Sequence, residues 1–129
     1  MTVVKKLQIY KCEICGNIVE VIHAGKPALV CCEKPMTLCT ENSTYASQEK
    51  HVPILKETSN GIIVKIGSRP HPMEDTHYIE WIQINTKNKS YREFLNPGDT
   101  PEAKFEINAD ENINIEIRAY CNLHGLWRN

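Results

Sequence analysis

No stretch of the sequence approaches the ~20 consecutive apolar residues of a membrane-spanning helix. Lys5 and Lys6 lie where a secretory signal peptide needs an apolar run. Bulk charge of one sign is also missing, because 15 basic and 16 acidic side chains leave a formal net charge of -1. Nucleic acid and anionic lipid are therefore not expected partners, and any anion must be attracted locally. We expect a cytoplasmic protein without a membrane association.

The composition indicates a folded chain with two parts. Of its 129 residues, 41% are hydrophobic and 24% are charged, a mixture that can bury a core. Five of the six cysteines lie in the first 39 residues, whereas four of the five histidines lie after residue 50. A polar stretch without apolar periodicity, residues 40–48, separates the two groups. We therefore expect two domains, 1–39 and 40–129.

The second half has the pattern of short strands. Apolar side chains alternate with other residues at 62–66 and at 113–117, the period of a half-buried strand. Further β-rich runs, separated by turn signals, occupy 78–84, 91–95 and 105–107. Several short strands in about ninety residues favour an antiparallel β-sandwich. The expected fold class is mainly β, with an immunoglobulin-like sandwich after a small metal-binding domain.

Four cysteines of the first half have the spacing of a metal site. Cys12 and Cys15 form a C-x-x-C turn that continues into Gly16, and the adjacent pair Cys31 and Cys32 follows. Four thiolates favour tetrahedral coordination of zinc or iron, and thiols without a metal are the alternative. Because adjacent side chains normally point apart, we expect a strained backbone at the cysteine pair and a distorted tetrahedron.

The second half contains a group of histidines and one cysteine at strand edges and in loops: His51, His71, His77, Cys121 and His124. Taken singly, each histidine is more often a structural or surface residue than a ligand. Prolines on both sides of His71, and one two residues after His51, restrict the backbone and favour preorganised ligands. The grouping therefore indicates a second metal site.

A blue-copper site is the main rival for this second group. Such a site uses two histidines, a cysteine and a weak axial methionine, which usually follows the second histidine closely. No methionine follows His124, and Met73 is the only candidate. Copper would also leave two of the other histidines unexplained, so iron with more nitrogen ligands fits better.

Two sets of motifs resemble known families. The C-x-x-C-G turn with its later C-C pair resembles desulforedoxin, a small rubredoxin-related module with an Fe(Cys)4 centre. E-K-H-V-P, H-P-M and C-N-L-H-G, with the nearby Trp127, resemble the catalytic domain of superoxide reductases. Together they cover essentially the whole chain, which is similar to two-iron superoxide reductases of the desulfoferrodoxin type. A cupredoxin-like electron carrier and a zinc-stabilised binding module are the alternatives.

The resemblance implies two irons per chain. The first is held by the four cysteines at 12, 15, 31 and 32. The second has four imidazoles in one plane, from His51, His71, His77 and His124, and the Cys121 thiolate on one axis, with its sixth position open. No cofactor beyond these metals is implied.

His23 matches no ligand position, and we expect a structural or surface role for it. Cys39 would be a fifth sulfur, and we expect a free, buried thiol.

The implied activity is the one-electron reduction of superoxide to hydrogen peroxide, a detoxification that protects against oxidative stress. Lys50 is a candidate for drawing superoxide inward and assisting protonation, although an ordinary solvated lysine is the alternative. The resemblance implies that Glu49 occupies the sixth iron position in the oxidised resting state. It further implies a homodimer, with reduced rubredoxin as electron donor. The Fe(Cys)4 centre could serve as an electron relay or as a structural staple.

Overall fold

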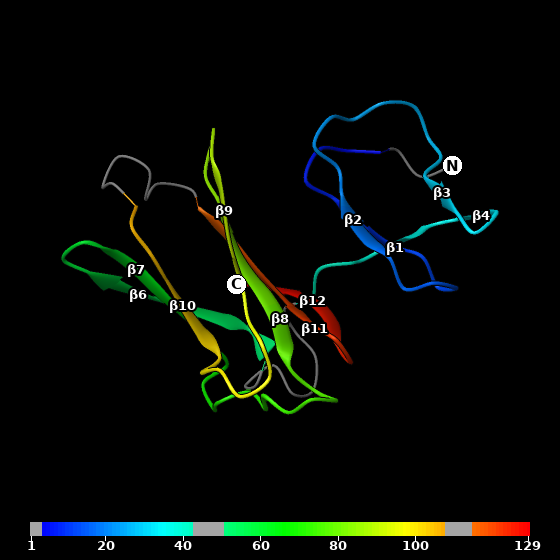
Figure 1. The fold of residues 1–129 in the computed structure, drawn as a ribbon. Coiled ribbons are helices and arrows are strands. Elements are labelled where there is room, and N and C mark those ends of the chain that lie inside the picture. The colour runs from blue at the N-terminus through cyan, green and yellow to red at the C-terminus, as the bar shows by residue number, and fades with distance from the viewer. Residues whose placement is uncertain (1–3, 43–50, 108–114) are drawn as a thin grey trace. The chain divides into compact units, whose positions relative to one another are not determined.

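The computed structural model describes residues 4–42, 51–107 and 115–129. The chain divides into two compact units, Met1–Thr40 and Glu41–Asn129. Their elements are short β-strands (Figure 1), as the mainly β fold class predicts. Within the described ranges, no helix has the length and apolar character needed to cross a membrane.

The first unit is built from five very short strands. A three-stranded antiparallel sheet has the order β2 (Ile18–Glu20), β1 (Ile9–Lys11), β5 (Thr37–Leu38). A separate hairpin pairs β3 (Val30–Cys31) with β4 (Lys34–Pro35). The cysteine pair therefore lies at the turn of this hairpin.

The apolar core of this unit is small. Val4, Tyr10 and Val21 are buried, and Leu29, Met36 and Leu38 pack against them partly buried. Units of about 40 residues usually need a metal, disulfides or a partner to be stable. The five cysteines of this unit are free thiols, and four of them lie close enough together to hold a metal ion.

The second unit is an antiparallel β-sandwich, as predicted. Its strands are β6 (Pro53–Thr58), β7 (Gly61–Ile66), β8 (Ile79–Asn85), β9 (Ser90–Phe94), β10 (Glu102–Phe105), β11 (Glu116–Cys121) and β12 (Gly125–Arg128). One sheet has the order β10-β7-β6 and the other β12-β11-β8-β9. Apolar side chains of both sheets meet in one buried core.

The core confirms the alternation seen in the sequence. Ile62, Val64 and Ile66 of β7 are buried, as the pattern at 62–66 predicts. Ile117 is buried at the start of β11, whereas part of the predicted run at 113–117 lies outside the described residues. The run at 105–107 was placed too late, because the strand that pairs with β7 is Glu102–Phe105.

The sandwich brings the predicted site residues to one region. His51 lies two residues before β6, and Cys121 is the last residue of β11, just after a register shift between Tyr120 and Cys121. His124 lies in the turn between β11 and β12. His71 and His77 both lie in the connection from β7 to β8, where Glu74 and His77 form an isolated antiparallel bridge.

Candidate metal centres

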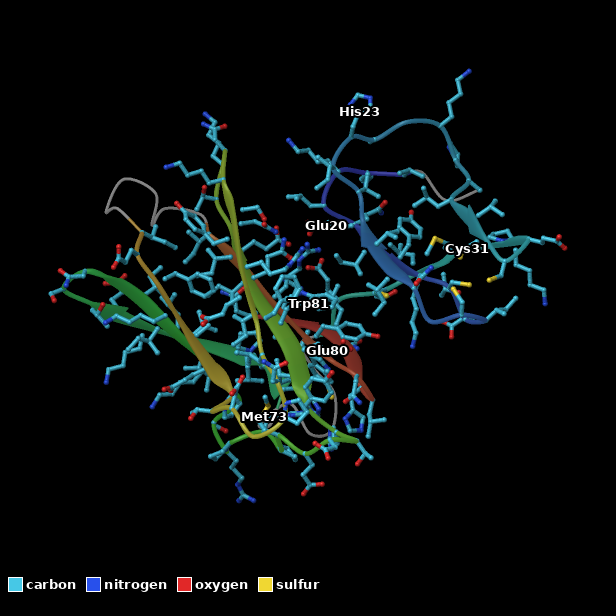
Figure 2. All side chains as sticks on the ribbon, in the orientation of Figure 1. Glu20, His23, Cys31, Met73, Glu80 and Trp81 are labelled. Atoms are coloured by element: carbon cyan, nitrogen blue, oxygen red, sulfur yellow. The ribbon has the colours of Figure 1, made fainter. Side chains whose placement is uncertain are left out.

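The four cysteine sulfurs of the first unit form a compact group (Figure 2). All four lie within 4.8 Å of one another, with 3.5 Å between Cys15 Sγ and Cys31 Sγ and 4.0 Å between Cys31 Sγ and Cys32 Sγ. A metal–sulfur distance of about 2.3 Å gives sulfur–sulfur distances of about 3.8 Å in a tetrahedron. The group therefore fits one tetrahedral ion.

The backbone explains how these sulfurs converge. The Cys15 N–H approaches Cys12 Sγ at 3.5 Å, and the Gly16 N–H donates to the Cys12 carbonyl at 2.9 Å. Gly16 has a φ of 83°, which favours glycine. Cys32 and Glu33 have φ values of 51° and 64°, in the left-handed region. The backbone strain expected at the cysteine pair is thus present.

The four thiols hold their protons unequally. Backbone N–H groups of Cys15 and Ile14 stabilise the Cys12 thiolate and lower its pKa to about 6. Hydrogen bonds with the thiols of Cys15 and Cys12 raise the pKa of Cys32 to about 12. One thiolate is thus readily available, and binding of a cation would release further protons.

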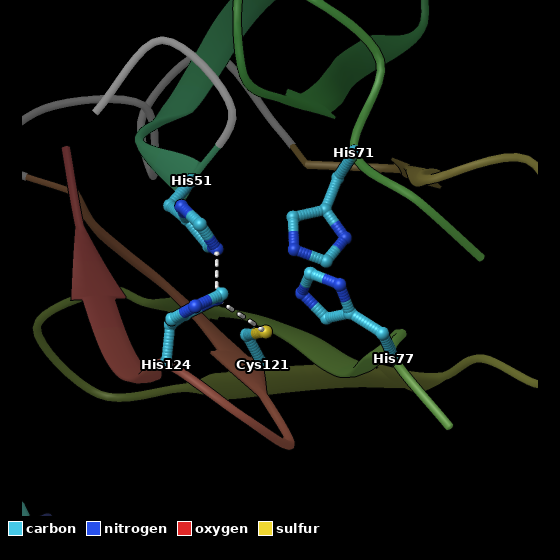
Figure 3. A group of neighbouring side chains, drawn as sticks. All are labelled: His51, His71, His77, Cys121 and His124. Atoms are coloured by element: carbon cyan, nitrogen blue, oxygen red, sulfur yellow. Dashed lines mark hydrogen bonds between the residues drawn. The ribbon is translucent and has the colours of Figure 1, made fainter. Parts of the chain in front are cut away.

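The four histidines and Cys121 form the second group (Figure 3). Their ligand atoms all lie within 4.8 Å of one another. Neighbouring rings, in the order His51, His71, His77, His124, have centroids 4.7 to 5.0 Å apart, and His51 and His77 lie 6.4 Å apart across the ring of imidazoles. The four side chains thus surround a common point.

The distances in this group also fit a metal. His51 Nε2 lies 3.0 Å from His124 Nδ1, and Cys121 Sγ lies 3.7 Å from the same nitrogen. Metal–nitrogen distances of about 2.1 Å give about 3.0 Å between neighbouring nitrogens and about 4.2 Å between opposite ones. Nitrogen-rich ligation with one thiolate suits iron, copper or zinc, and five donors exceed the four of a structural zinc site.

His71 has the orientation of a metal ligand. Its Nδ1–H donates to the Pro72 carbonyl at 2.6 Å, which leaves Nε2 buried and without a hydrogen-bond partner among the described residues. Ligand histidines commonly use the second ring nitrogen in this way. Burial lowers the pKa of His71 to about 4, so the imidazole is neutral near pH 7 and can bind a cation.

Cys121 is the one sulfur of the second group, and it is fully buried. Burial raises the pKa of its thiol, although the backbone N–H groups of His124 and Leu123 act in the opposite direction. A nearby cation would therefore be needed to hold this side chain as a thiolate.

Two residues that support these ligands were not assigned such roles from the sequence. Trp127 stacks on the His51 ring at 4.7 Å, and its indole N–H donates to the His124 carbonyl at 3.1 Å. Asn122 bonds the segment that carries His77. Asn122 lies in the same C-N-L-H-G motif as His124, but the motif alone does not indicate which residues Asn122 or Trp127 contacts.

Four further sequence candidates belong to neither described group of ligands. Glu49 and Lys50 lie outside the described residues. Cys39 is a free thiol but only half-buried, and burial raises its pKa. His23 is exposed and belongs to neither group.

The fold and the two groups define a class of protein: a small tetrathiolate unit followed by a β-sandwich with a histidine-rich, thiolate-containing metal centre. Comparisons with known proteins identify the family within this class. The desulfoferrodoxin N-terminal domain matches residues 4–39, and desulfoferrodoxin matches residues 43–129. The chain belongs to the desulfoferrodoxin family, and both groups are iron sites.

Individual relatives agree with this assignment. The chain is 54% identical to a desulfoferrodoxin of Syntrophotalea carbinolica, over 95% of each chain. It is 31% identical to a superoxide reductase of Thermococcus kodakarensis, over 63% of this chain and 84% of the relative. The crystal structure of the superoxide reductase from Treponema pallidum superimposes with a TM-score of 0.77 at 25% identity, covering 96% of this chain and 97% of that one.

Proposed function

We propose that the protein is a superoxide reductase, which reduces superoxide to hydrogen peroxide at the histidine-rich centre. The observation that carries this proposal is a group of five donors in the second unit, which leaves one position of a six-coordinate ion free. The relatives from Thermococcus kodakarensis and Treponema pallidum, both named superoxide reductases, support the same activity. Each superoxide takes up one electron and two protons to give hydrogen peroxide.

We assign the five side chains of the second group as ligands of the catalytic iron. An iron held there supplies the electron and a face to which a small anion can bind. The buried imidazoles of His51 and His71 fix one side of the site, whereas His124 and Leu123 are exposed. Among the described residues, the exposed side of the site is therefore the side on which a small anion would approach the metal.

The Cys121 thiolate has a distinct role in this proposal. Its anionic sulfur donates electron density to the metal, as thiolate ligands do in haem proteins, and so favours electron transfer to superoxide. The fully buried position of the sulfur keeps it away from water and from the product. Replacing this sulfur should therefore impair the chemistry more than it impairs metal binding.

Lys50 and Glu49 complete the proposed site. The Lys50 ammonium would attract superoxide locally, since a net charge of -1 offers no general attraction to an anion. It would also assist the protonation that releases the product. The Glu49 carboxylate would occupy the sixth position in the oxidised resting state and leave before superoxide binds.

The first unit would have a different task. We assign Cys12, Cys15, Cys31 and Cys32 as the ligands of an Fe(Cys)4 centre, whose complete thiolate shell leaves no place for a substrate. Such a centre can transfer electrons or stabilise a unit with a small core.

We also propose domains at 1–39 and 40–129, a homodimer, a cytoplasmic location, and rubredoxin as the donor in electron transport.

Two measurements test this function. Metal analysis should find two irons per chain, whereas a cupredoxin-like carrier would contain copper and a zinc-stabilised module zinc. The reduced protein should then convert each superoxide into one hydrogen peroxide without releasing dioxygen. A dismutase would instead release dioxygen together with half as much peroxide, and that result would contradict the proposal.

A further inference from the structure

We propose that Asn122 is a positioning residue, which fixes the backbone around His77 relative to the loop that carries Cys121 and His124. This inference rests on the proposed function, because it assumes that these three side chains hold the catalytic iron. It assigns a specific task to a residue that binds no metal itself.

Three hydrogen bonds join residue 122 to the segment around His77. The Tyr78 N–H donates to Asn122 Oδ1 at 2.9 Å, and Asn122 Nδ2 donates to the Thr76 carbonyl at 3.1 Å. The Asn122 N–H donates to the Tyr78 carbonyl at 3.2 Å. One carboxamide therefore holds the residues on both sides of His77.

The location of His77 explains why such a link is needed. His77 lies in the connection between β7 and β8, outside the regular strands, where a backbone has more freedom than in a sheet. Reciprocal bonds with the Glu74 backbone close the turn that contains His77, but they are internal to that connection. Asn122 instead ties the turn to a segment 44 residues further along the chain, directly beside Cys121.

The other ligands are oriented by different contacts. The Pro72 carbonyl orients His71, and Trp127 contacts both the His51 ring and the His124 carbonyl. Asn122 thus supplies the cross-link between the His77 turn and the loop of Cys121. Partners that orient ligands in this way typically change metal affinity by 10–100-fold when they are replaced.

The chemistry of these bonds requires a carboxamide. Oδ1 must accept from an N–H, while Nδ2 must donate to a carbonyl oxygen, and an asparagine side chain offers both groups at this length. Asn122→Leu keeps the branched shape but loses both bonds. Asn122→Asp keeps the acceptor for Tyr78 but places a carboxylate oxygen opposite the Thr76 carbonyl, where two acceptors repel.

Iron release to a chelator tests the inference in the iron-loaded full-length protein. We expect the histidine-rich centre of Asn122→Leu to release iron ten-fold or more faster than wild type, and that of Asn122→Asp to fall between them. The absorption band of thiolate bound to ferric iron should also shift. The Fe(Cys)4 centre should release iron at the wild-type rate, which provides an internal control.

Asn129→Leu is the matched control, because Asn129 Oδ1 also accepts a backbone N–H, at 3.2 Å, but from Ile117, which lies four residues before Cys121 and not beside His77. Its iron release should equal that of wild type. Equal release and an unchanged spectrum in Asn122→Leu would overturn the inference. If Asn122→Leu does not fold, iron release and a spectrum equal to wild type in Asn122→Asp would overturn the inference.

Hydrogen exchange of the wild-type protein supplies a measurement that needs no variant. The Tyr78 amide should be protected, and unprotected exchange at this amide would also overturn the inference. Neither experiment uses superoxide. A wild-type protein that holds both irons but fails to reduce superoxide would disprove the proposed function alone, whereas unchanged iron release in the variants would disprove the role of Asn122 alone.

Discussion

Replacing Trp127 should loosen the histidine-rich centre in two separable steps. Trp127→Phe keeps an aromatic ring over His51 but removes the N–H that donates to the His124 carbonyl at 3.1 Å. A hydrogen bond of this kind contributes about 1 kcal/mol net. Since 1.36 kcal/mol corresponds to about ten-fold, iron release should become about five-fold faster.

Trp127→Leu removes the stacking on His51 as well. Aromatic pairs contribute about 0.5–1.5 kcal/mol beyond the area that they bury, so the combined loss should exceed about ten-fold. Trp127 is only 3% exposed, so the leucine variant should also unfold at a lower temperature. Chelator-induced iron release, followed by absorbance, measures the first effect, and thermal unfolding measures the second.

Trp81→Phe is the matched control for these variants. Trp81 is similarly buried and stacks on Tyr120, but its Nε1 has no hydrogen-bond partner among the described residues. Loss of this N–H should therefore leave iron release unchanged. The reasoning would be refuted if Trp127→Phe retained iron as well as wild type, or if Trp81→Phe released it equally fast.

Four further predictions concern individual side chains. Cys121→Ser should abolish superoxide reduction even where iron stays bound by the four histidines, and wild-type turnover with confirmed iron content would contradict this role. Cys12→Ser should disrupt the tetrathiolate centre, while the sandwich keeps its iron and this iron is still oxidised in single-turnover mixing with superoxide. A sandwich that holds iron but does not react with superoxide would show that the two centres do not function independently. Lys50→Ile should slow the bimolecular reaction with superoxide about ten-fold or more and weaken the dependence of its rate on salt. The attraction between unit charges ~4 Å apart is about 1 kcal/mol in water and about 4 kcal/mol at an effective dielectric of 20. An unchanged rate and an unchanged salt dependence would show that Lys50 is an ordinary solvated surface residue. The metal-free protein should lose free energy of unfolding as the pH falls from about 6.5 through about 4. Burial depresses the pKa of His71 in the folded state, so in this range the unfolded chain binds a proton that the folded chain does not. Chemical denaturation across this range should show a smaller loss of unfolding free energy in His71→Gln than in wild type.

The sequence predicted the strands best where one face of a sheet is buried. Ile62, Val64 and Ile66 alternate and are buried because β7 packs one face on the core. The same rule fails at Gln83, which alternation would place on the outer, solvated face of β8. Gln83 is fully buried, and its Oε1 accepts from Arg118 at 2.7 and 3.1 Å. A buried polar pair from two strands cannot be read from either strand alone.

The residues of the two metal groups could also be predicted from the sequence. Cysteine and histidine are chemically distinctive, so short motifs were enough to nominate the residues that the fold brings together. The contacts that orient them were not predictable, because they join distant segments. The bond from Tyr78 to Asn122 spans 44 residues, and it depends on the pairing of β8 with β11.

The most direct test of the central claim is the product balance of the fully reduced, two-iron protein mixed with a limiting amount of superoxide. The account predicts that the histidine-rich centre is oxidised, that each superoxide yields one hydrogen peroxide, and that no dioxygen appears. Release of dioxygen with half the peroxide, or oxidation of the tetrathiolate centre alone, would contradict it.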